Sequence, residues 1–259
     1  MARPAGDAVV PEAQEPRQSS LREPLAACAV AIAIAAGLFW AGQAVGFVQQ
    51  IMHGLIACAF LLGPRLAVRI SGRPFDERAA GITLHPLRPA LRVLGVALLF
   101  TWPAFVLGFF LYYGVVCPGH GPLRAFSEMM APICARWHGW AGFHLRLPDG
   151  FFVLLLSQIL VVAVPEEIFF RGYLMSRFEE RWPSRARLWG ARVGWPLLVS
   201  SLLFAAGHFL VDLAPARLAV FFPALVFGWM RSRSGSVAPG AVFHALCNVL
   251  SEVLHDSAF

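Results

Sequence analysis

The sequence predicts an all-α membrane protein, a polytopic transmembrane helical bundle with about seven spans, within a range of six to eight. Of its 259 residues, 58% are hydrophobic and only 14% are charged, and the mean hydropathy is +0.65. A soluble domain usually carries about 25% charged residues, so this composition indicates a membrane environment. The apolar runs are continuous rather than alternating, which argues against a transmembrane β-barrel.

Each predicted span is an apolar run close to the roughly 20 residues that cross the hydrocarbon core. The candidates are 25–45, 46–64, 92–115, 150–176, 195–213, 217–231 and 237–255. The first two are almost continuous, and they fit either a tight hairpin or one long helix plus a re-entrant piece. We therefore expect a disordered cytoplasmic tail at 1–24, membrane helices and loops at 25–149, and a core that carries the polar motifs at 150–255.

The basic residues are all Arg, and they predict the orientation in the membrane. The net charge is +6, and the Arg residues cluster at 64–92, 171–192 and 231–233. A nucleic-acid-binding protein would group them on one soluble face, so we expect no nucleic-acid partner. With seven spans, these segments and the tail lie on one side, which the positive-inside rule assigns to the cytoplasm.

The opposite loop, 117–149, is then extracytoplasmic. Cys117 and Cys134 lie in this loop and could pair if the compartment is oxidising, and the sequence leaves open whether they do. The high Arg, Ala and Pro content without Lys indicates a bacterium with a high-GC genome. The expected location is therefore the bacterial inner (cytoplasmic) membrane, with the N-terminus in the cytoplasm.

The first polar motif in the core is Glu166-Glu167 with Arg171, which follows a long apolar run. An ionisable residue inside a membrane span is costly and is a candidate for function. Glu167 and Arg171 are spaced i,i+4 and can form an ion pair on a helix. Glu166 would stay unpaired and partly desolvated, a state suited to taking a proton from water. The alternative is a helix end whose charges serve only topology.

Two further motifs lie in later apolar runs. His208 follows Phe204 by one turn, and its alternative role is a hydrogen-bonded core histidine. His244 and Asn248 share one face of the last run, where two donors can stabilise a developing oxyanion. Polar contact between helices is the alternative for this pair. A base, a group that orients water and two oxyanion donors together suit water attack on an amide.

The order Glu-Glu-x3-Arg, Phe-x3-His and His-x3-Asn resembles the CAAX protease and bacteriocin-processing (CPBP, or Abi) family of intramembrane glutamic endopeptidases, which includes the type 2 CAAX prenyl proteases. The resemblance covers about 150–255, which would be the protease core. It implies that Glu166 activates the water with help from His208, and that His244 and Asn248 form the oxyanion hole. Glu167, Arg171 and Phe204 would support the site.

The resemblance also bears on cofactors and substrates. The family was once regarded as metalloendopeptidase-like, and Glu166, His208 and His244 are residue types that bind metals. No His-Glu-x-x-His motif is present, so we expect no metal and no other cofactor. The expected partners are membrane lipid and a membrane-associated peptide or protein substrate. Relatives cut prenylated tails, bacteriocin precursors or C-terminal sorting helices. The composition typical of a high-GC bacterium favours a bacterial peptide or membrane-anchored protein over a prenylated tail, and the sequence does not identify the substrate further.

Two other functions remain open at this level. One is a non-catalytic membrane chaperone, immunity or scaffold protein with the same fold, although every motif is intact. The other is a small transporter with an intramembrane carboxylate, although neither inverted repeats nor paired broken helices are found.

The depth of the motifs makes one structural prediction. Glu166 and His208 reach the same depth only if the helix of Glu166 continues past Tyr173 to about Phe178 and the next helix begins near Pro196. We expect that arrangement.

Overall fold

The computed structural model describes residues 20–259, so most of the tail expected at 1–24 lies outside the described residues. The first helix begins at Arg22, and the expected end of the tail at residue 24 therefore falls within it. The elements follow in this order: α1 Arg22–Ala44, α2 Gly46–Ser71, α3 Leu87–Val116, η1 Gly121–Leu123, α4 Arg124–Met129, α5 Ala131–Cys134, α6 Phe151–Ser157, η2 Gln158–Ala163, α7 Val164–Glu167, η3 Ile168–Leu174, α8 Met175–Arg181, β1 Ala186–Leu188, β2 Ala191–Val193, α9 Trp195–Asp212, η4 Pro215–Val220, α10 Phe221–Ser234 and α11 Ala238–Ala258.

The all-α membrane fold is confirmed. In the described part of the chain, five helical segments are long and apolar enough to cross a membrane: Arg22–Ala44, Gly46–Ser71, Leu87–Val116, Phe151–Arg181 and Trp195–Asp212. Two other runs that the sequence predicted as spans, now α10 and α11, do not meet these criteria of length and hydropathy. The α10 helix has only 14 residues, and α11 has 21 residues that include His244, Asn248 and Glu252. Both pack within the bundle, α10 against α9 and α11 against α3.

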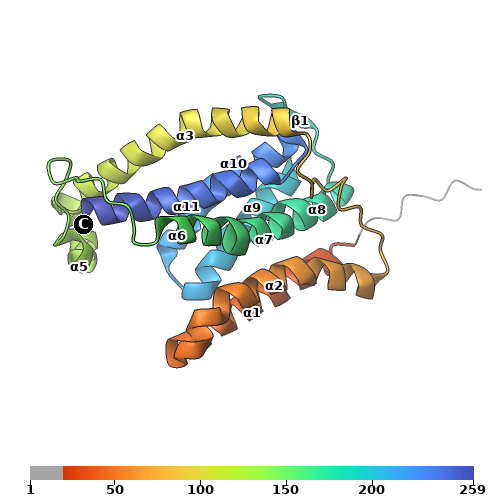
Figure 1. Cartoon of the computed structure of the whole chain (residues 1–259), viewed down its shortest axis with the longest axis horizontal. Coiled ribbons are helices and arrows are strands. Elements are labelled where there is room, and N and C mark those ends of the chain that lie inside the picture. Colours follow the sequence, from red (N-terminus) through yellow and green to blue (C-terminus); the bar gives the residue numbers. More distant parts are fainter. Residues whose placement is uncertain (1–19) are drawn as a thin grey trace, which may run out of the picture.

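The helices lie roughly along the long axis of the molecule (Figure 1). The α1–α2 pair runs along one side and α3 along the opposite side, with α6 to α11 between them. Of the two arrangements considered for 25–64, the hairpin is the one formed, because Val45 breaks the helix in an extended conformation. One set of buried aromatic side chains, including Phe60, Phe169 and Phe204, packs α2 and α9 against the central helix.

The central helix continues from Phe151 to Arg181, and α9 begins at Trp195. This confirms the arrangement that brings Glu166 and His208 to similar depths. The helix is not uniformly α: η2 and η3 are π-helical and flank the short segment α7. Pro165 lies in α7, and a proline inside a helix removes one backbone hydrogen bond. Wide π turns relieve such a defect and change which face the following side chains occupy.

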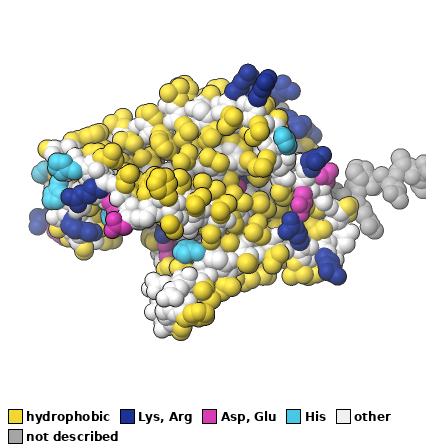
Figure 2. Space-filling view, in the orientation of Figure 1, with side chains coloured by type: hydrophobic (Ala, Val, Ile, Leu, Met, Phe, Trp, Pro, Cys, Tyr) yellow, Lys and Arg dark blue, Asp and Glu magenta, His cyan; other side chains and the backbone are white. Residues whose placement is uncertain are grey.

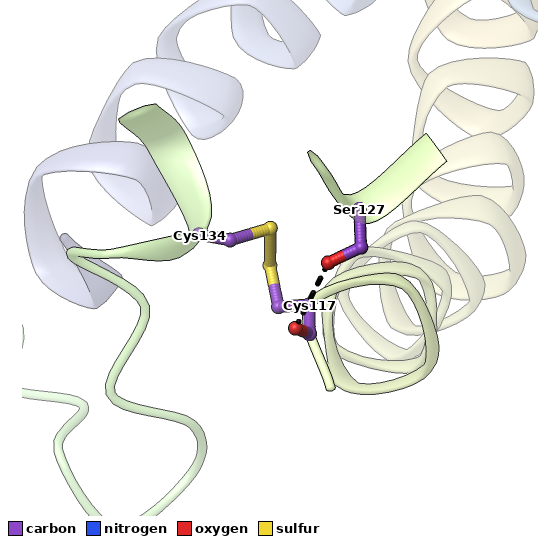
Figure 3. Close-up of a disulfide and its surroundings, with 3 residues drawn as sticks. All are labelled: Cys117, Ser127 and Cys134. Atoms are coloured by element: carbon purple, nitrogen blue, oxygen red, sulfur yellow. Dashed lines mark hydrogen bonds between the residues drawn. A yellow bond between two sulfur atoms is a disulfide. The ribbon is translucent and has the colours of Figure 1, made fainter. Parts of the chain in front are cut away.

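The two ends of the molecule differ in chemistry. At one end, Cys117 and Cys134 form a disulfide with Cα atoms 5.1 Å apart, which joins α5 to the end of α3 (Figure 3). The Ser127 hydroxyl donates a hydrogen bond to the Cys117 carbonyl in the same loop. At the other end, Glu23 of α1 accepts hydrogen bonds from Arg73 and Arg177, both at about 3 Å. This ion-pair network fixes the start of α1 to the loop after α2 and to α8.

A short antiparallel hairpin between α8 and α9 is the one sheet in the described residues, and the sequence did not indicate it. Its strands β1 and β2 are joined by Trp189 and Gly190, both with positive φ, of 47° and 80°. Two successive residues with positive φ are typical of the tight turn that matches the twist of a hairpin.

Candidate active site

The innermost feature of the candidate site is an ion pair on the central helix. Arg171 Nη1 donates to Glu167 Oε1 at 2.8 Å, and the two side chains are only 1% and 0% exposed. Arg171 Nη2 also donates to the Ala224 carbonyl at 3.2 Å, and its guanidinium lies 4.3 Å from the centre of the Phe204 ring. Burial of this kind is tolerated only when both charges are paired. The pair therefore fixes Glu167 in one position.

Glu166 and His244 face each other beside that pair. Nε2 of His244 lies 3.8 Å from Oε2 of Glu166, and Nδ1 of the same ring lies 3.3 Å from Oε1 of Glu167. Oε2 of Glu166 is buried and has no hydrogen-bond partner among the described residues. The two adjacent glutamates thus differ: one is held by Arg171, and the other presents a free acceptor next to an imidazole.

Gly240 allows α11 to come this close. A Cβ added at Gly240 would lie 3.3 Å from Oε2 of Glu167, which is tighter than ordinary contact, and 3.5 Å from the Phe227 carbonyl oxygen, which is ordinary contact. Gly240 precedes His244 by one helical turn, so the same close approach places the imidazole beside the carboxylates. The Phe227 ring stacks on the His244 ring with centroids 4.8 Å apart and fixes its plane.

His208 lies on α9 and reaches the site through Phe204. Its Nδ1 is 2.9 Å from the Phe204 carbonyl oxygen, which can only accept, so Nδ1 must donate. In a neutral imidazole this leaves Nε2 as an acceptor. The Phe204 ring is 4.3 Å from the His208 ring and 5.8 Å from the His244 ring, centroid to centroid. His208 and Glu166 form no direct hydrogen bond in the described part of the chain.

The Asp212 side chain, one turn after His208, forms hydrogen bonds at the C-terminal end of α9. Its carboxylate accepts from the Ala214 backbone N–H at 3.2 Å and from Arg217 Nε at 2.7 Å. This agrees with a role in capping the span at its interface.

Asn248 has a partner that sequence reasoning missed. Its Nδ2 donates to Oε1 of Gln158 at 2.8 Å, across from α11 to η2. An amide has two N–H donors, so Asn248 keeps one for another acceptor. The signal was present in the sequence, since Gln158 is a polar residue in the middle of an apolar run, and such residues often join helices.

Replacing Gln158 with Leu should slow turnover roughly tenfold, because Asn248 loses the hydrogen bond that orients its amide. Peptide cleavage, measured as kcat and KM separately, checks this, and KM should change little. The variant Gln158→Glu keeps the acceptor and should restore most of the rate. Gln50→Leu, the same change at an exposed position of α2, is the control, and an equal loss there would contradict the prediction.

The structure brings five of the candidate residues together: Glu166, Glu167, Arg171, Phe204 and His244. His208 contacts this group through the Phe204 ring. Asn248 lies one turn after His244 on α11 and is hydrogen-bonded to Gln158. Within the described residues, no three or more His, Cys, Asp or Glu side chains are grouped closely enough to hold a metal ion. The expectation of a metal-free site remains a prediction that a chelator can test.

The fold and the site define an integral membrane protein with charged and imidazole side chains enclosed by apolar helices. Residues 148–250 match the family model described as type II CAAX prenyl endopeptidase Rce1-like. This match confirms the family resemblance based on the three motifs, and it supports a peptidase of the CAAX-protease type. No curated protein and no solved structure matches the chain significantly.

Proposed function

We propose that the chain is an intramembrane glutamic endopeptidase that hydrolyses a peptide bond of a membrane-associated peptide or protein. The observation that carries this proposal is the buried Oε2 atom of Glu166, which lacks a hydrogen-bond partner among the described residues and lies 3.8 Å from His244. Because Arg171 already holds Glu167, Glu166 is the carboxylate free to take a proton from water.

His208 would orient the same water. Its Nδ1–H is used by the Phe204 carbonyl, so Nε2 can accept a hydrogen bond from the water that Glu166 deprotonates. The water oxygen then attacks the carbonyl carbon of the peptide bond. The proton held on Glu166 is passed to the leaving amine as the carbon–nitrogen bond breaks.

His244 and Asn248 would stabilise the negative charge that develops on the carbonyl oxygen. Asn248 offers the N–H that Gln158 does not use. If Nδ1 of His244 donates to Glu167, Nε2 can donate to the oxyanion only when the ring carries both protons.

The proposed reaction uses no metal and no organic cofactor. Substrates would be peptides or proteins that enter from the membrane, because the site is enclosed by apolar helices. Prenylated tails, bacteriocin precursors and C-terminal sorting helices are the three substrate classes to compare. A bacterial peptide or membrane-anchored protein is the preferred candidate.

We place the chain in a bacterial inner membrane with its N-terminus in the cytoplasm. The disulfide end suits an oxidising compartment, and the end with the Arg-rich loops suits the cytoplasm. Alkaline phosphatase fused in the loop at residue 120 should be active, whereas a fusion at residue 184 should be inactive. The reverse pattern would contradict this orientation.

The function is tested with purified protein in detergent and a panel of transmembrane and prenylated peptides. Wild type, Glu166→Ala and His208→Ala are compared with and without a chelator. Wild type should cleave at least one peptide, both variants should lose most of that activity, and the chelator should have no effect. Activity that survives in Glu166→Ala would exclude Glu166 as the base, and loss on chelation would favour a metal. If folded wild-type protein cleaves no peptide of a broad panel, the result favours a non-catalytic scaffold protein over a peptidase.

A further inference from the structure

The hairpin between α8 and α9 presents an arrangement of charge that the candidate active site does not use. Its strands pair so that Arg187 lies directly opposite Arg192. Side chains opposite each other in an antiparallel pair share one face, with Cβ atoms about 5 Å apart. Two like charges so placed destabilise a hairpin unless an anion lies between them.

The other face of the hairpin is fixed to the protein. Ala191 on that face is fully buried, and β2 packs on α10. Trp229 of α10 donates from Nε1 to the Leu188 carbonyl at 3.0 Å. Gly190 lies under the Arg233 side chain, since a Cβ there would be 2.9 Å from Arg233 Nε. The hairpin is thus held in one orientation, with its Arg pair directed outward.

Within residues 20–259, no acidic side chain forms an ion pair with either Arg187 or Arg192. Both side chains are exposed, as are Arg181, Arg185 and Arg233 close by. Figure 2 shows dark-blue basic side chains gathered at the end of the molecule where Figure 1 labels β1.

The position of the hairpin in the chain indicates where it lies relative to the membrane. It connects two segments that are long and apolar enough to cross a membrane, Phe151–Arg181 and Trp195–Asp212, which places it at a membrane surface. Trp189 at its tip is 81% exposed and Trp195 is 66% exposed. Exposed tryptophan at this level is typical of the membrane–water interface.

We propose that Arg187 and Arg192 form a binding site for the phosphate of an anionic phospholipid, with Trp189 lying in the interface beside it. Two guanidinium groups on one face can donate several hydrogen bonds to one phosphate group, which also removes their mutual repulsion. This lipid site anchors the loop between the two helices that carry Glu166 and His208. The proposal does not depend on the catalytic function.

Native mass spectrometry of the intact chain, titrated with phosphatidylglycerol and separately with phosphatidylcholine, tests the site. Wild type should bind phosphatidylglycerol more tightly than phosphatidylcholine. The variant R187Q/R192Q should bind phosphatidylglycerol about thirtyfold more weakly, from the usual contribution of each basic residue near an anionic surface. Its binding of phosphatidylcholine and its melting temperature in detergent alone should not change.

The matched control is R88Q/R92Q, which removes two exposed Arg residues from the first turns of α3. It should keep nearly all of the affinity for phosphatidylglycerol. Equal losses in both double variants would mean that net charge alone attracts the lipid, and this would overturn the site. Glycerol phosphate that binds as tightly as the lipid would also overturn it, because the site would then recognise a soluble phosphate.

Discussion

Glu166→Gln should lower the rate of peptide cleavage by about 10²- to 10⁴-fold, the range expected when a general base is removed. Glutamine keeps the size of the side chain but cannot take a proton from water. Glu166 accepts no hydrogen bond at Oε2 and has only His244, at 3.8 Å, within ion-pair distance in the described part of the chain. The substitution should therefore leave the melting temperature in detergent close to that of wild type.

Glu252→Gln is the matched control, because Glu252 is an exposed glutamate on α11. It should retain full activity. The assignment of Glu166 fails if Glu166→Gln keeps more than about a tenth of the wild-type rate, because a lost base costs more than that. A large fall in melting temperature would instead assign Glu166 a structural role.

Arg171→Leu should be the most destabilising single change at the site. It leaves the Glu167 carboxylate, which is 0% exposed, without its cation, and breaking a buried pair in this way costs about 3–5 kcal/mol. It also removes the donor to the Ala224 carbonyl and the contact with the Phe204 ring. Thermal unfolding in detergent, followed by loss of monodisperse protein, measures the effect.

Two comparisons make this prediction specific. Arg124 and Glu128 form another i,i+4 pair, with side chains 79% and 66% exposed, so Arg124→Leu should change the melting temperature little. The double variant Glu167→Leu/Arg171→Leu removes both charges and should recover much of the lost stability. A melting temperature for Arg171→Leu equal to that of wild type would contradict the account of the buried pair.

The candidate residues could be proposed from the sequence because each is a polar residue in an apolar run. Glu166, His208, His244 and Asn248 all stand out on that ground. The pairing of Glu167 with Arg171 followed from i,i+4 spacing, which is a local property of a helix. The continuation of the central helix past Tyr173 was predicted to about Phe178 from the depth that Glu166 and His208 need to share, and the helix ends at Arg181.

The relations between helices could not be predicted in the same way. That His244 lies beside Glu166, while His208 packs against Phe204, depends on how α9 and α11 cross the central helix. The π turns on both sides of Glu166 and Glu167 alter the faces that these residues occupy, and a regular helical count does not include them. Gln158 was missed because its importance comes from Asn248, which is 90 residues away in the chain.

The two ends of the bundle also differ in how much the sequence indicated about them. The sequence left open whether Cys117 and Cys134 pair, because it gives only their place in one polar loop, and the structure shows the disulfide. The hairpin at the other end was not expected, because strands of three residues are too short for a recognisable alternation. Its Trp189–Gly190 turn was the local signal.

The central claim is that a water molecule activated by Glu166 attacks a peptide bond within the membrane. The most direct measurement is cleavage of a reconstituted transmembrane peptide in ¹⁸O-labelled water with a chelator present, with fragments mapped by mass spectrometry. Wild type should produce an N-terminal fragment whose new carboxylate carries ¹⁸O, from a bond in the apolar segment, and Glu166→Gln should produce almost none. Equal amounts of the labelled fragment from wild type and Glu166→Gln would contradict the account.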